Sequence, residues 1–109
     1  FSRVGSVDRC SYVDKTHAGW MFSGRCLRVR PNTEIDSEYL YYYFCMDEIK
    51  EFVRNIAVGA TMPSINTKLL GEVTVRFPDL VQQKKIAGVL SAIDGKIKVN
   101  QKINDNLAA

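Results

Sequence analysis

The sequence predicts an α+β fold, in which a small mixed or antiparallel β-sheet body with helices is followed by a long C-terminal coiled-coil helix. Three observations lead to this prediction. Residues 72–77 alternate between polar and apolar side chains, as a half-buried strand does. Residues 36–57 repeat apolar side chains at helical spacing, and residues 79–107 keep a heptad spacing throughout. We therefore expect two parts, a body over residues 1–78 and a coiled-coil helix over residues 79–109.

The N-terminal third of the chain predicts strands and loops. Leu27 and Val29 alternate with Arg28 and Arg30, which is typical of a half-buried strand. Pro31 would end this strand, because proline has no N–H group to donate to a neighbouring strand.

A single helix is predicted from Asp36 to about Ala57. Aspartate is a preferred N-terminal cap, and its charge suits the positive end of the helix dipole. Apolar residues at spacings of three and four share one face of this helix: Ile49, Phe52, Val53 and Ile56. Tyr39 and the tyrosines at 41–43 are expected to pack in the core with some hydroxyls reaching water. Gly59 follows as a stop signal.

Asn66 is expected to cap one short helical turn over residues 67–70, which Gly71 would close. The strand over residues 72–77 follows, and Pro78 ends it. The buried face of this strand is predicted from its alternate residues: Val73, Val75 and Phe77.

The last helix is predicted to begin after Asp79, with Gln82 completing a capping box. A coiled-coil seam with alternating spacings of four and three runs along it: Ile86, Leu90, Ile93, Ile97, Asn100, Asn104 and Leu107. A helix over residues 80–107 would measure about 42 Å, longer than a small body is wide. Its far half therefore either finds a partner helix or extends unpaired, and seam asparagines would fix register and partner choice. Gly88 and Gly95 share a face that a neighbouring backbone could approach closely.

Composition narrows the classes of function. The 109 residues suit one domain, 46% of them are hydrophobic, and no apolar run is long enough to span a membrane. The net charge of +3 singles out no class of partner. The chain starts at Phe1 without a signal pattern, so we expect it to be a piece of a longer chain.

No catalytic chemistry, metal site or cofactor is predicted. Cys10, Cys26 and Cys45 form no Cys-x-x-Cys pair, and His17 is the single histidine. A nucleophile pair of Cys10 with His17 is formally possible, but buried, reduced thiols in a reducing cytoplasm are the expected interpretation. No paired carboxylates or phosphate-binding loop occur in the sequence.

A series of short motifs occurs along residues 19–109. They are Gly19-Trp20 with Phe22-Ser23-Gly24, Ile35-Asp36, Tyr39-Leu40, Gly59-Ala60-Thr61, Val73-x-Val75-x-Phe77-Pro78, Gln83-Lys84-Lys85-Ile86-Ala87 with Leu90, and Ile93-Asp94 with Ile97. In combination they resemble the DNA-specificity (S) subunit of type I restriction-modification systems. The similar part is the second half of one target-recognition domain followed by the conserved helix that spaces two such domains.

The resemblance implies a cytoplasmic DNA-binding protein that is not an enzyme. In that family the S subunit reads the two halves of a split target in double-stranded DNA and carries methyltransferase (M) and restriction (R) subunits. Two long helices pair antiparallel and set the spacer between the half-sites. This chain has no Asn/Asp-Pro-Pro-Tyr-type motif of adenine methylation, so methylation would come from a partner. It would supply part of one recognition domain and one spacer helix.

Candidate DNA contacts are of two kinds. Cations predominate in residues 1–33, where they suit phosphate neutralisation: Arg3, Arg9, Lys15, Arg25, Arg28 and Arg30. The loop after Gly59 offers short hydrogen-bond donors and one cation, suited to phosphates or base edges. The alternatives are an ordinary solvated surface and a structural loop. His17 is a further candidate for a base edge or phosphate, with an ordinary exposed loop histidine as the alternative. The full DNA-binding set is Arg3, Lys15, His17, Arg25, Arg28, Thr61, Ser64, Asn66 and Lys68.

The seam of the last helix is the candidate site for a partner helix. Its partner would be the corresponding helix of a second recognition domain or of a second copy of the chain. A competing hypothesis from another class is a protein–protein scaffold that dimerises through this helix and has no DNA affinity of its own.

Overall fold

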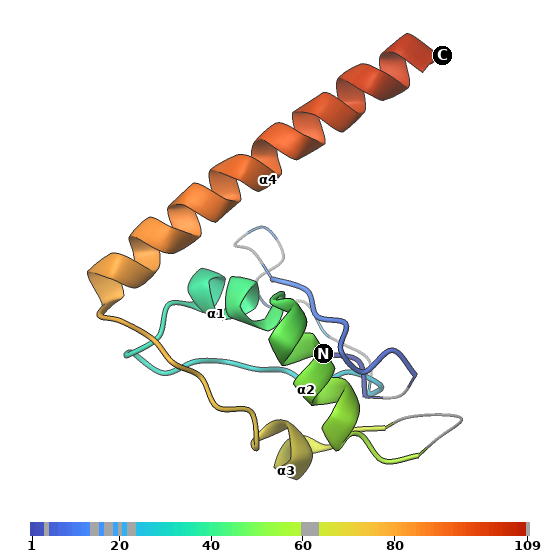
Figure 1. Cartoon of the computed structure of the whole chain (residues 1–109), viewed down its shortest axis with the longest axis vertical. Helices are drawn as coiled ribbons and strands as arrows, with labels where there is room; N and C mark the ends of the chain where they lie inside the picture. The colour runs from blue at the N-terminus through green and yellow to red at the C-terminus, as the bar shows by residue number, and fades with distance from the viewer. Residues whose placement is uncertain are drawn as a thin grey trace.

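The computed structural model describes residues 1–3, 5–13, 16, 19, 21, 24–59 and 64–108. The helices in this part of the chain are α1 (Ser37–Phe44), α2 (Asp47–Ile56), α3 (Thr67–Leu70) and α4 (Leu80–Ala108). Figure 1 shows α1, α2 and α3 in a small body, from which α4 extends as one straight rod whose C-terminal end lies away from the body. The longest dimension of the molecule is 43 Å, about the length of this helix alone at roughly 1.5 Å per residue. The predicted long C-terminal helix is thus confirmed.

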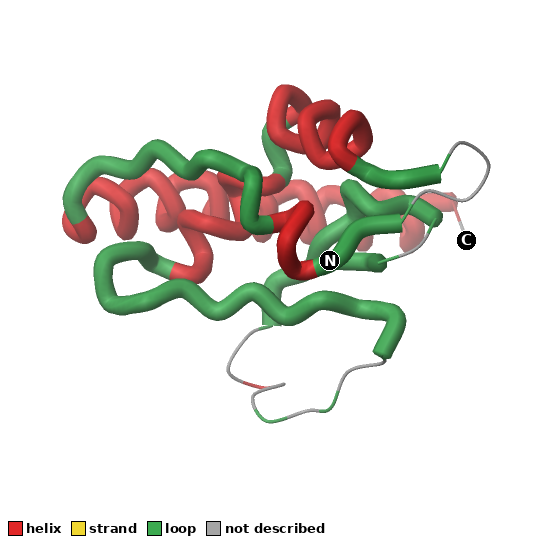
Figure 2. Tube along the Cα trace, turned by 90° about the horizontal axis from the view of Figure 1, so that it is seen from below, coloured by secondary structure: helices red, strands yellow, loops and turns green. Residues whose placement is uncertain are grey.

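The predicted β-sheet body is wrong. Backbone pairing outside the helices consists, in the described residues, of two isolated antiparallel bridges, Ser2 with Cys26 and Val58 with Ser64. Figure 2 accordingly shows helices joined by long irregular segments and no strand. The body is therefore helical rather than α+β.

Tyrosine hydroxyls explain why residues 72–77 need no neighbouring strand. Val73 and Val75 are half-buried between exposed residues, so the alternation is real, but Phe77 is 42% exposed. The Tyr43 hydroxyl donates to the Thr74 carbonyl at 3.0 Å and accepts from the Arg76 N–H at 3.3 Å. The Tyr39 hydroxyl donates to the Arg76 carbonyl at 3.0 Å. Side chains of α1 thus occupy backbone groups that a second strand would otherwise bind.

The strand predicted around residues 27–30 is reduced to a short pairing with the N-terminus. The Leu27 N–H donates to the Phe1 carbonyl at 2.7 Å, and the N-terminal ammonium of Phe1 donates to the Leu27 carbonyl at 3.0 Å. Beyond this point Val29 is 40% exposed. The alternation of apolar residues therefore extends beyond the residues that pair with the N-terminus.

The single helix predicted over residues 36–57 is broken. Its start is confirmed, because the Asp36 carboxylate accepts from the Tyr39 N–H at 3.0 Å. α1 nevertheless ends at Phe44, and Met46 has an extended backbone (φ −65°, ψ 138°) before α2 begins. The break changes the direction of the chain, so that α1 and α2 bury different residues.

The core lies where distant segments meet. Val7, Val53 of α2 and Ile65 are buried together, with Phe1 and Leu27 packed against them. α1 adds a second buried pair, Leu40 and Phe44, and the Phe44 ring meets the Phe1 ring edge-on at 4.8 Å. In the predicted apolar face of α2, Val53 is buried, whereas Phe52 is 41% exposed.

Two local predictions are confirmed. Asn66 caps α3, since its side chain accepts from the Leu69 N–H at 2.9 Å, and Gly71 is the C-terminal cap. Asp79 likewise accepts from the Gln82 N–H at 2.9 Å at the start of α4. Within the described residues, no helix combines the length and apolar character needed to cross a membrane.

Candidate nucleic-acid interface and partner helix

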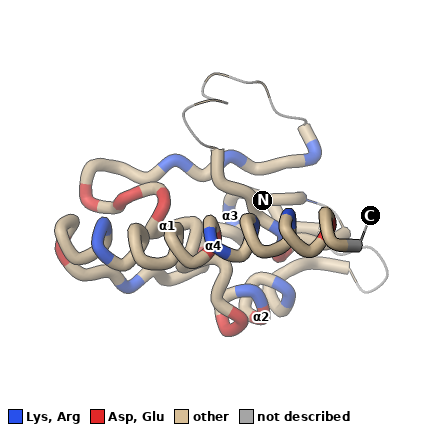
Figure 3. Tube along the Cα trace, turned by 90° about the horizontal axis from the view of Figure 1, so that it is seen from above, with Lys and Arg blue, Asp and Glu red and all other residues tan. Residues whose placement is uncertain are grey.

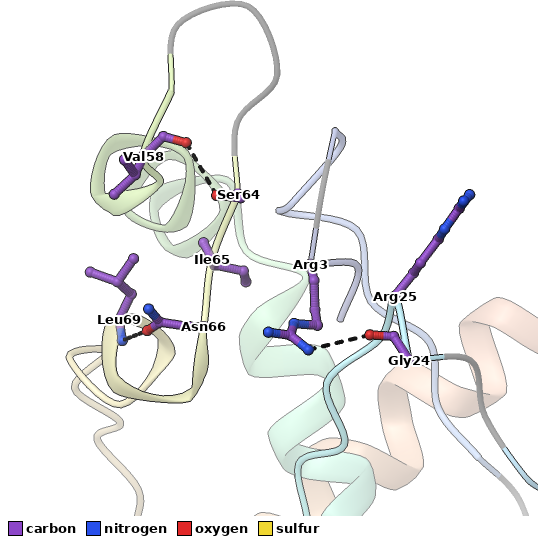
Figure 4. Close-up of a pocket in the computed structure, with 8 residues that line it drawn as sticks. All are labelled: Arg3, Gly24, Arg25, Val58, Ser64, Ile65, Asn66 and Leu69. Atoms are coloured by element: carbon purple, nitrogen blue, oxygen red, sulfur yellow. Dashed lines mark hydrogen bonds between the residues drawn. The ribbon is translucent and has the colours of Figure 1, made fainter.

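A cavity of about 430 Å³ lies between three segments that are distant in sequence. The N-terminal segment contributes Arg3, the turn before the Ser2–Cys26 bridge contributes Arg25, and the segment leading into α3 contributes Ser64 and Asn66. Figure 4 shows the side chains of Arg3, Ser64 and Asn66 beside the opening, whereas the side chain of Arg25 points away from it. Four of the nine predicted DNA-binding residues therefore come together.

The backbone of Arg3 holds the walls of the cavity together. Its N–H donates to the Arg25 carbonyl at 2.8 Å, and its carbonyl accepts from the Ile65 N–H at 2.8 Å. Ile65 is buried in the core, so both arginines are carried on backbone that the core fixes. The exposed side chains of Arg3 and Arg25 thus extend from backbone that the core holds in place.

The two arginines point in different directions. One terminal nitrogen of Arg3, Nη1, donates to the Gly24 carbonyl at 3.3 Å, which draws this side chain back across the opening. The Arg25 side chain extends outward, as Figure 4 shows, and both residues are exposed. Among the described lining residues there are two cations and no acid, so the opening favours an anion.

Ser64 and Asn66 supply short polar groups to the same wall. The Asn66 side-chain oxygen is used by the α3 cap, while its amide nitrogen carries donors that the cap does not use. Ser64 pairs with Val58 through two backbone hydrogen bonds of 2.8 and 2.9 Å, and its hydroxyl also donates to the Val58 carbonyl at 3.4 Å. The donors left for a ligand on this wall are therefore those of the Asn66 amide. Donors of this kind suit phosphate oxygens or base edges.

Two of the other predicted residues lie outside the cavity. Arg28 and Lys68 are exposed but do not line the cavity. Lys15, His17 and Thr61 fall outside the described residues. The apolar part of the lining, Val58, Ile65 and Leu69, was not predicted, and apolar residues flanking the polar loop were the only signal for it.

The described residues offer no group of three or more His, Cys, Asp and Glu side chains that could hold a metal ion. The three cysteines are free and half-buried. Burial raises the pKa of the Cys10 thiol, and the neighbouring Cys45 acts in the same direction. A thiol that is protonated at neutral pH is a poor nucleophile, so Cys10 is a poor candidate for covalent chemistry.

α4 meets the body along one narrow row of residues. Gln83 and Ala87 are buried, and Asp94 accepts a hydrogen bond of 2.7 Å from the Tyr42 hydroxyl of α1. Burial, together with this hydrogen bond and the charge of Asp94, raises the pKa of Tyr42 to about 12. The hydroxyl therefore stays protonated and can keep donating at physiological pH.

The predicted seam lies on a neighbouring face of α4 and is uncovered. Its apolar members are exposed by 41% at Ile86, 36% at Leu90, 51% at Ile93, 48% at Ile97 and 80% at Leu107. Asn100 and Asn104 are exposed as well. Three seam residues lie three positions after the residues that face the body, which is a rotation of about 60° around the helix. The pairs are Gln83 with Ile86, Ala87 with Leu90, and Asp94 with Ile97. Both faces can therefore be occupied at the same time.

Lysines recur along α4, as the blue segments of this helix in Figure 3 show. They are exposed at Lys84, Lys85, Lys96, Lys98 and Lys102. Exposed lysines next to an apolar row keep such a helix soluble and leave the row itself open to a partner.

Comparison with known proteins connects these features. The profile of the type I restriction modification DNA specificity domain matches residues 2–109. The chain is 38% identical over 77 residues to the type I restriction enzyme MjaIX specificity subunit of Methanocaldococcus jannaschii, covering 71% of this chain and 18% of that protein. It is 28% identical over 102 residues to the HindI specificity subunit of Haemophilus influenzae, covering 91% of this chain and 22% of that protein. The chain thus spans about a fifth of the length of these relatives. No solved structure matches it.

Proposed function

This chain belongs to the type I restriction modification DNA specificity family, and from that premise we propose that it is a non-catalytic DNA-recognition part of a specificity subunit. It binds one half-site of a split target in double-stranded DNA and positions methyltransferase subunits for the chemistry. Restriction subunits join the same assembly. Such an assembly acts on DNA in the cytoplasm, where the free thiols of the chain stay reduced.

The observation that supports DNA binding best is the grouping of Arg3, Arg25, Ser64 and Asn66 around one cavity. Two exposed cations and short donors without an acid are the combination that contacts a phosphate backbone. Base reading would then fall to side chains beside these anchors.

We assign α4 the role of the spacer helix. Its exposed apolar seam fits the corresponding helix of a second recognition domain, or the same helix of a second copy. Gln83, Ala87 and Asp94 face the body, so pairing along the seam would leave the attachment of α4 undisturbed.

Titration of random duplex DNA at two salt concentrations tests DNA binding. We expect binding that weakens with salt. Replacing both cavity arginines, Arg3→Gln with Arg25→Gln, should lower the slope of log affinity against log salt by about one per lost phosphate contact. The matched control removes two exposed cations of α4, Lys98→Gln with Lys102→Gln. Equal slopes for the two double variants would show that the cavity is not part of the DNA interface.

Sedimentation of the chain alone tests the seam. Ile93→Asp with Ile97→Asp should abolish concentration-dependent self-association while circular dichroism stays unchanged. The control, Val81→Asp with Val99→Asp, places the same charges on the opposite face of α4, where both valines are also exposed. Association without DNA binding at low salt would favour the competing scaffold function. Normal association of the seam variant would exclude the seam as the pairing surface.

A further inference from the structure

Gln83 is the one buried polar side chain in the described part of the chain, with 0% of its surface exposed. Its neighbours Gln82 and Lys84 on α4 are both exposed. A glutamine side chain that leaves water must recover its hydrogen bonds within the protein.

The Gln83 amide recovers them in full. Its oxygen accepts from the Asp36 N–H at 2.7 Å. Its nitrogen donates one hydrogen to the Glu34 carbonyl at 2.9 Å and the other to the Pro78 carbonyl at 2.8 Å. All three partners are backbone groups, so none of these bonds depends on the rotamer of a second side chain.

The backbone groups that bind the Gln83 side chain lie beside the starts of two helices, α1 and α4. Asp36 is the N-terminal cap of α1, and its carboxylate holds the Tyr39 N–H. Pro78 lies two residues before the start of α4. The side chain thus joins the first turn of α4 to the first turn of α1 and to the incoming chain.

A second attachment lies farther along α4. The Tyr42 hydroxyl of α1 donates to the Asp94 carboxylate at 2.7 Å, about 16 Å beyond Gln83 along the helix axis. Ala87, 2% exposed, packs between the two points. Two points on a straight rod define its direction, and Gln83 is the buried one.

We propose that Gln83 is a positioning residue that fixes the direction in which α4 leaves the body. The significance of that direction depends on the proposed function. Residue 107 lies about 36 Å beyond Gln83, so a tilt of about 10° would move it by about 6 Å. Base pairs are spaced by roughly 3.4 Å, so a loosened attachment would displace the recognition body by more than one base pair of the DNA spacer.

The chemistry of the site requires an amide. A glutamate in this place would present its ionised oxygens to the carbonyls of Glu34 and Pro78, with the acidic side chains of Asp36 and Asp79 in the adjoining turns. The positive charges on this part of α4, Lys84 and Lys85, are exposed. A carboxyl at position 83 would therefore fit only when protonated, when it can donate one hydrogen and accept another.

Residual dipolar couplings of the ¹⁵N-labelled chain test the proposal. We expect the N–H couplings of α2 and α4 to fit one alignment tensor in the wild type. In Gln83→Met, which keeps the volume but not the hydrogen bonds, α4 should need a separate tensor of smaller magnitude. Hydrogen exchange of the Asp36 amide should accelerate by about tenfold or more, since it loses its acceptor. Gln82→Met, an exposed neighbour, should change neither result.

The proposal is overturned if Gln83→Met keeps a single tensor with the wild-type orientation of α4. Should this variant fail to fold, Gln83→Glu supplies the second test. The pH is varied from about 4 to about 8, a range that covers both the ordinary glutamate pKa of about 4.3 and a pKa raised by burial. At the acid end, α4 should share the alignment tensor of the body. At the alkaline end, α4 should need a separate tensor. Gln82→Glu should show no such change. An orientation of α4 in Gln83→Glu that is independent of pH would refute the role. Because no DNA is present, failure here leaves the DNA titration standing.

Discussion

Replacing Tyr43 by phenylalanine should destabilise the body, although the change removes a single exposed oxygen atom. The Tyr43 hydroxyl donates to the Thr74 carbonyl and accepts from the Arg76 N–H. Phenylalanine keeps the aromatic ring and therefore its edge-on contact with Phe44, whose centroid lies 6.5 Å away. The variant thus isolates the hydroxyl from the packing.

The expected size of the effect follows from these two hydrogen bonds. A protein hydrogen bond contributes about 0.5–1.5 kcal/mol net. Thr74 and Arg76 are exposed, so water can replace the lost partner and the low end applies. We expect the free energy of unfolding to fall by about 1 kcal/mol in total, which corresponds to a decrease in Tm of about 4–8 °C for a domain of this size.

Urea and thermal unfolding followed by circular dichroism measure this difference. Tyr39→Phe should lose about half as much, because that hydroxyl makes one backbone hydrogen bond to this segment instead of two. Tyr12→Phe, at a tyrosine that is 41% exposed and lies outside α1, is the control. If Tyr43→Phe unfolds like the control, the tyrosine hydroxyls do not replace a strand ladder and the explanation for the missing sheet fails.

Three further changes test other parts of the fold. Val53→Ala should lower the free energy of unfolding by about 1.5–3 kcal/mol in urea, because Val53 is 1% exposed. Burial, the largest single influence, raises the pKa of Asp8, but the Arg54 hydrogen bond, a backbone hydrogen bond and the positive charges of Arg54 and Lys50 together outweigh it and lower this pKa. Asp8→Asn should therefore cost at most about 1 kcal/mol at pH 7, since Arg54 is half exposed, and nothing once the pH falls below the folded pKa of Asp8. Gly88→Ala and Gly95→Ala should each stabilise α4 by about 1 kcal/mol, measured by helix content on heating, because a Cβ at either position meets open space. Weaker self-association of these alanine variants would instead show that a partner backbone approaches there.

The starts of α1, α3 and α4 were predictable because the responsible signals are local. Asp36, Asn66 and Asp79 each accept from a backbone N–H three residues ahead, so the residue type and its position suffice to mark the start. The heptad spacing of α4 is equally local, and the helix ends within one residue of the prediction. At these helix starts, the residues that form the capping hydrogen bond are close together in the sequence.

The missing sheet was not predictable because its cause is distant in sequence. Alternation over residues 72–77 correctly indicates that Val73 and Val75 turn inward. It does not indicate what binds the backbone of the segment, and here that partner is a pair of tyrosines more than thirty residues away. The break at Met46 has a similar origin, since Val53 must reach a core formed with Val7 and Ile65.

The candidate site was predictable in its composition and not in its grouping. Arg3, Arg25, Ser64 and Asn66 were selected as cations and short donors, from two stretches of chain that the sequence gives no reason to join. The backbone hydrogen bonds of Arg3 to both stretches supply that reason. Gln83 is part of a sequence motif, but no neighbouring residue predicts that its side chain is buried.

The two faces of α4 use different kinds of interaction, and this difference has a functional consequence. The face toward the body has little apolar area and relies on directional hydrogen bonds at Gln83 and Asp94. Such bonds fix an angle but contribute modest free energy. The seam has large apolar side chains, which contribute free energy of association with little directional preference. If α4 is the spacer helix proposed above, it must set a distance between two DNA-binding bodies, and this needs both a defined angle at its own body and strong apolar packing against its partner helix. The residues that contact the body and the residues of the seam are offset by three positions along α4. One helix can therefore hold its own body and bind a partner helix through different faces.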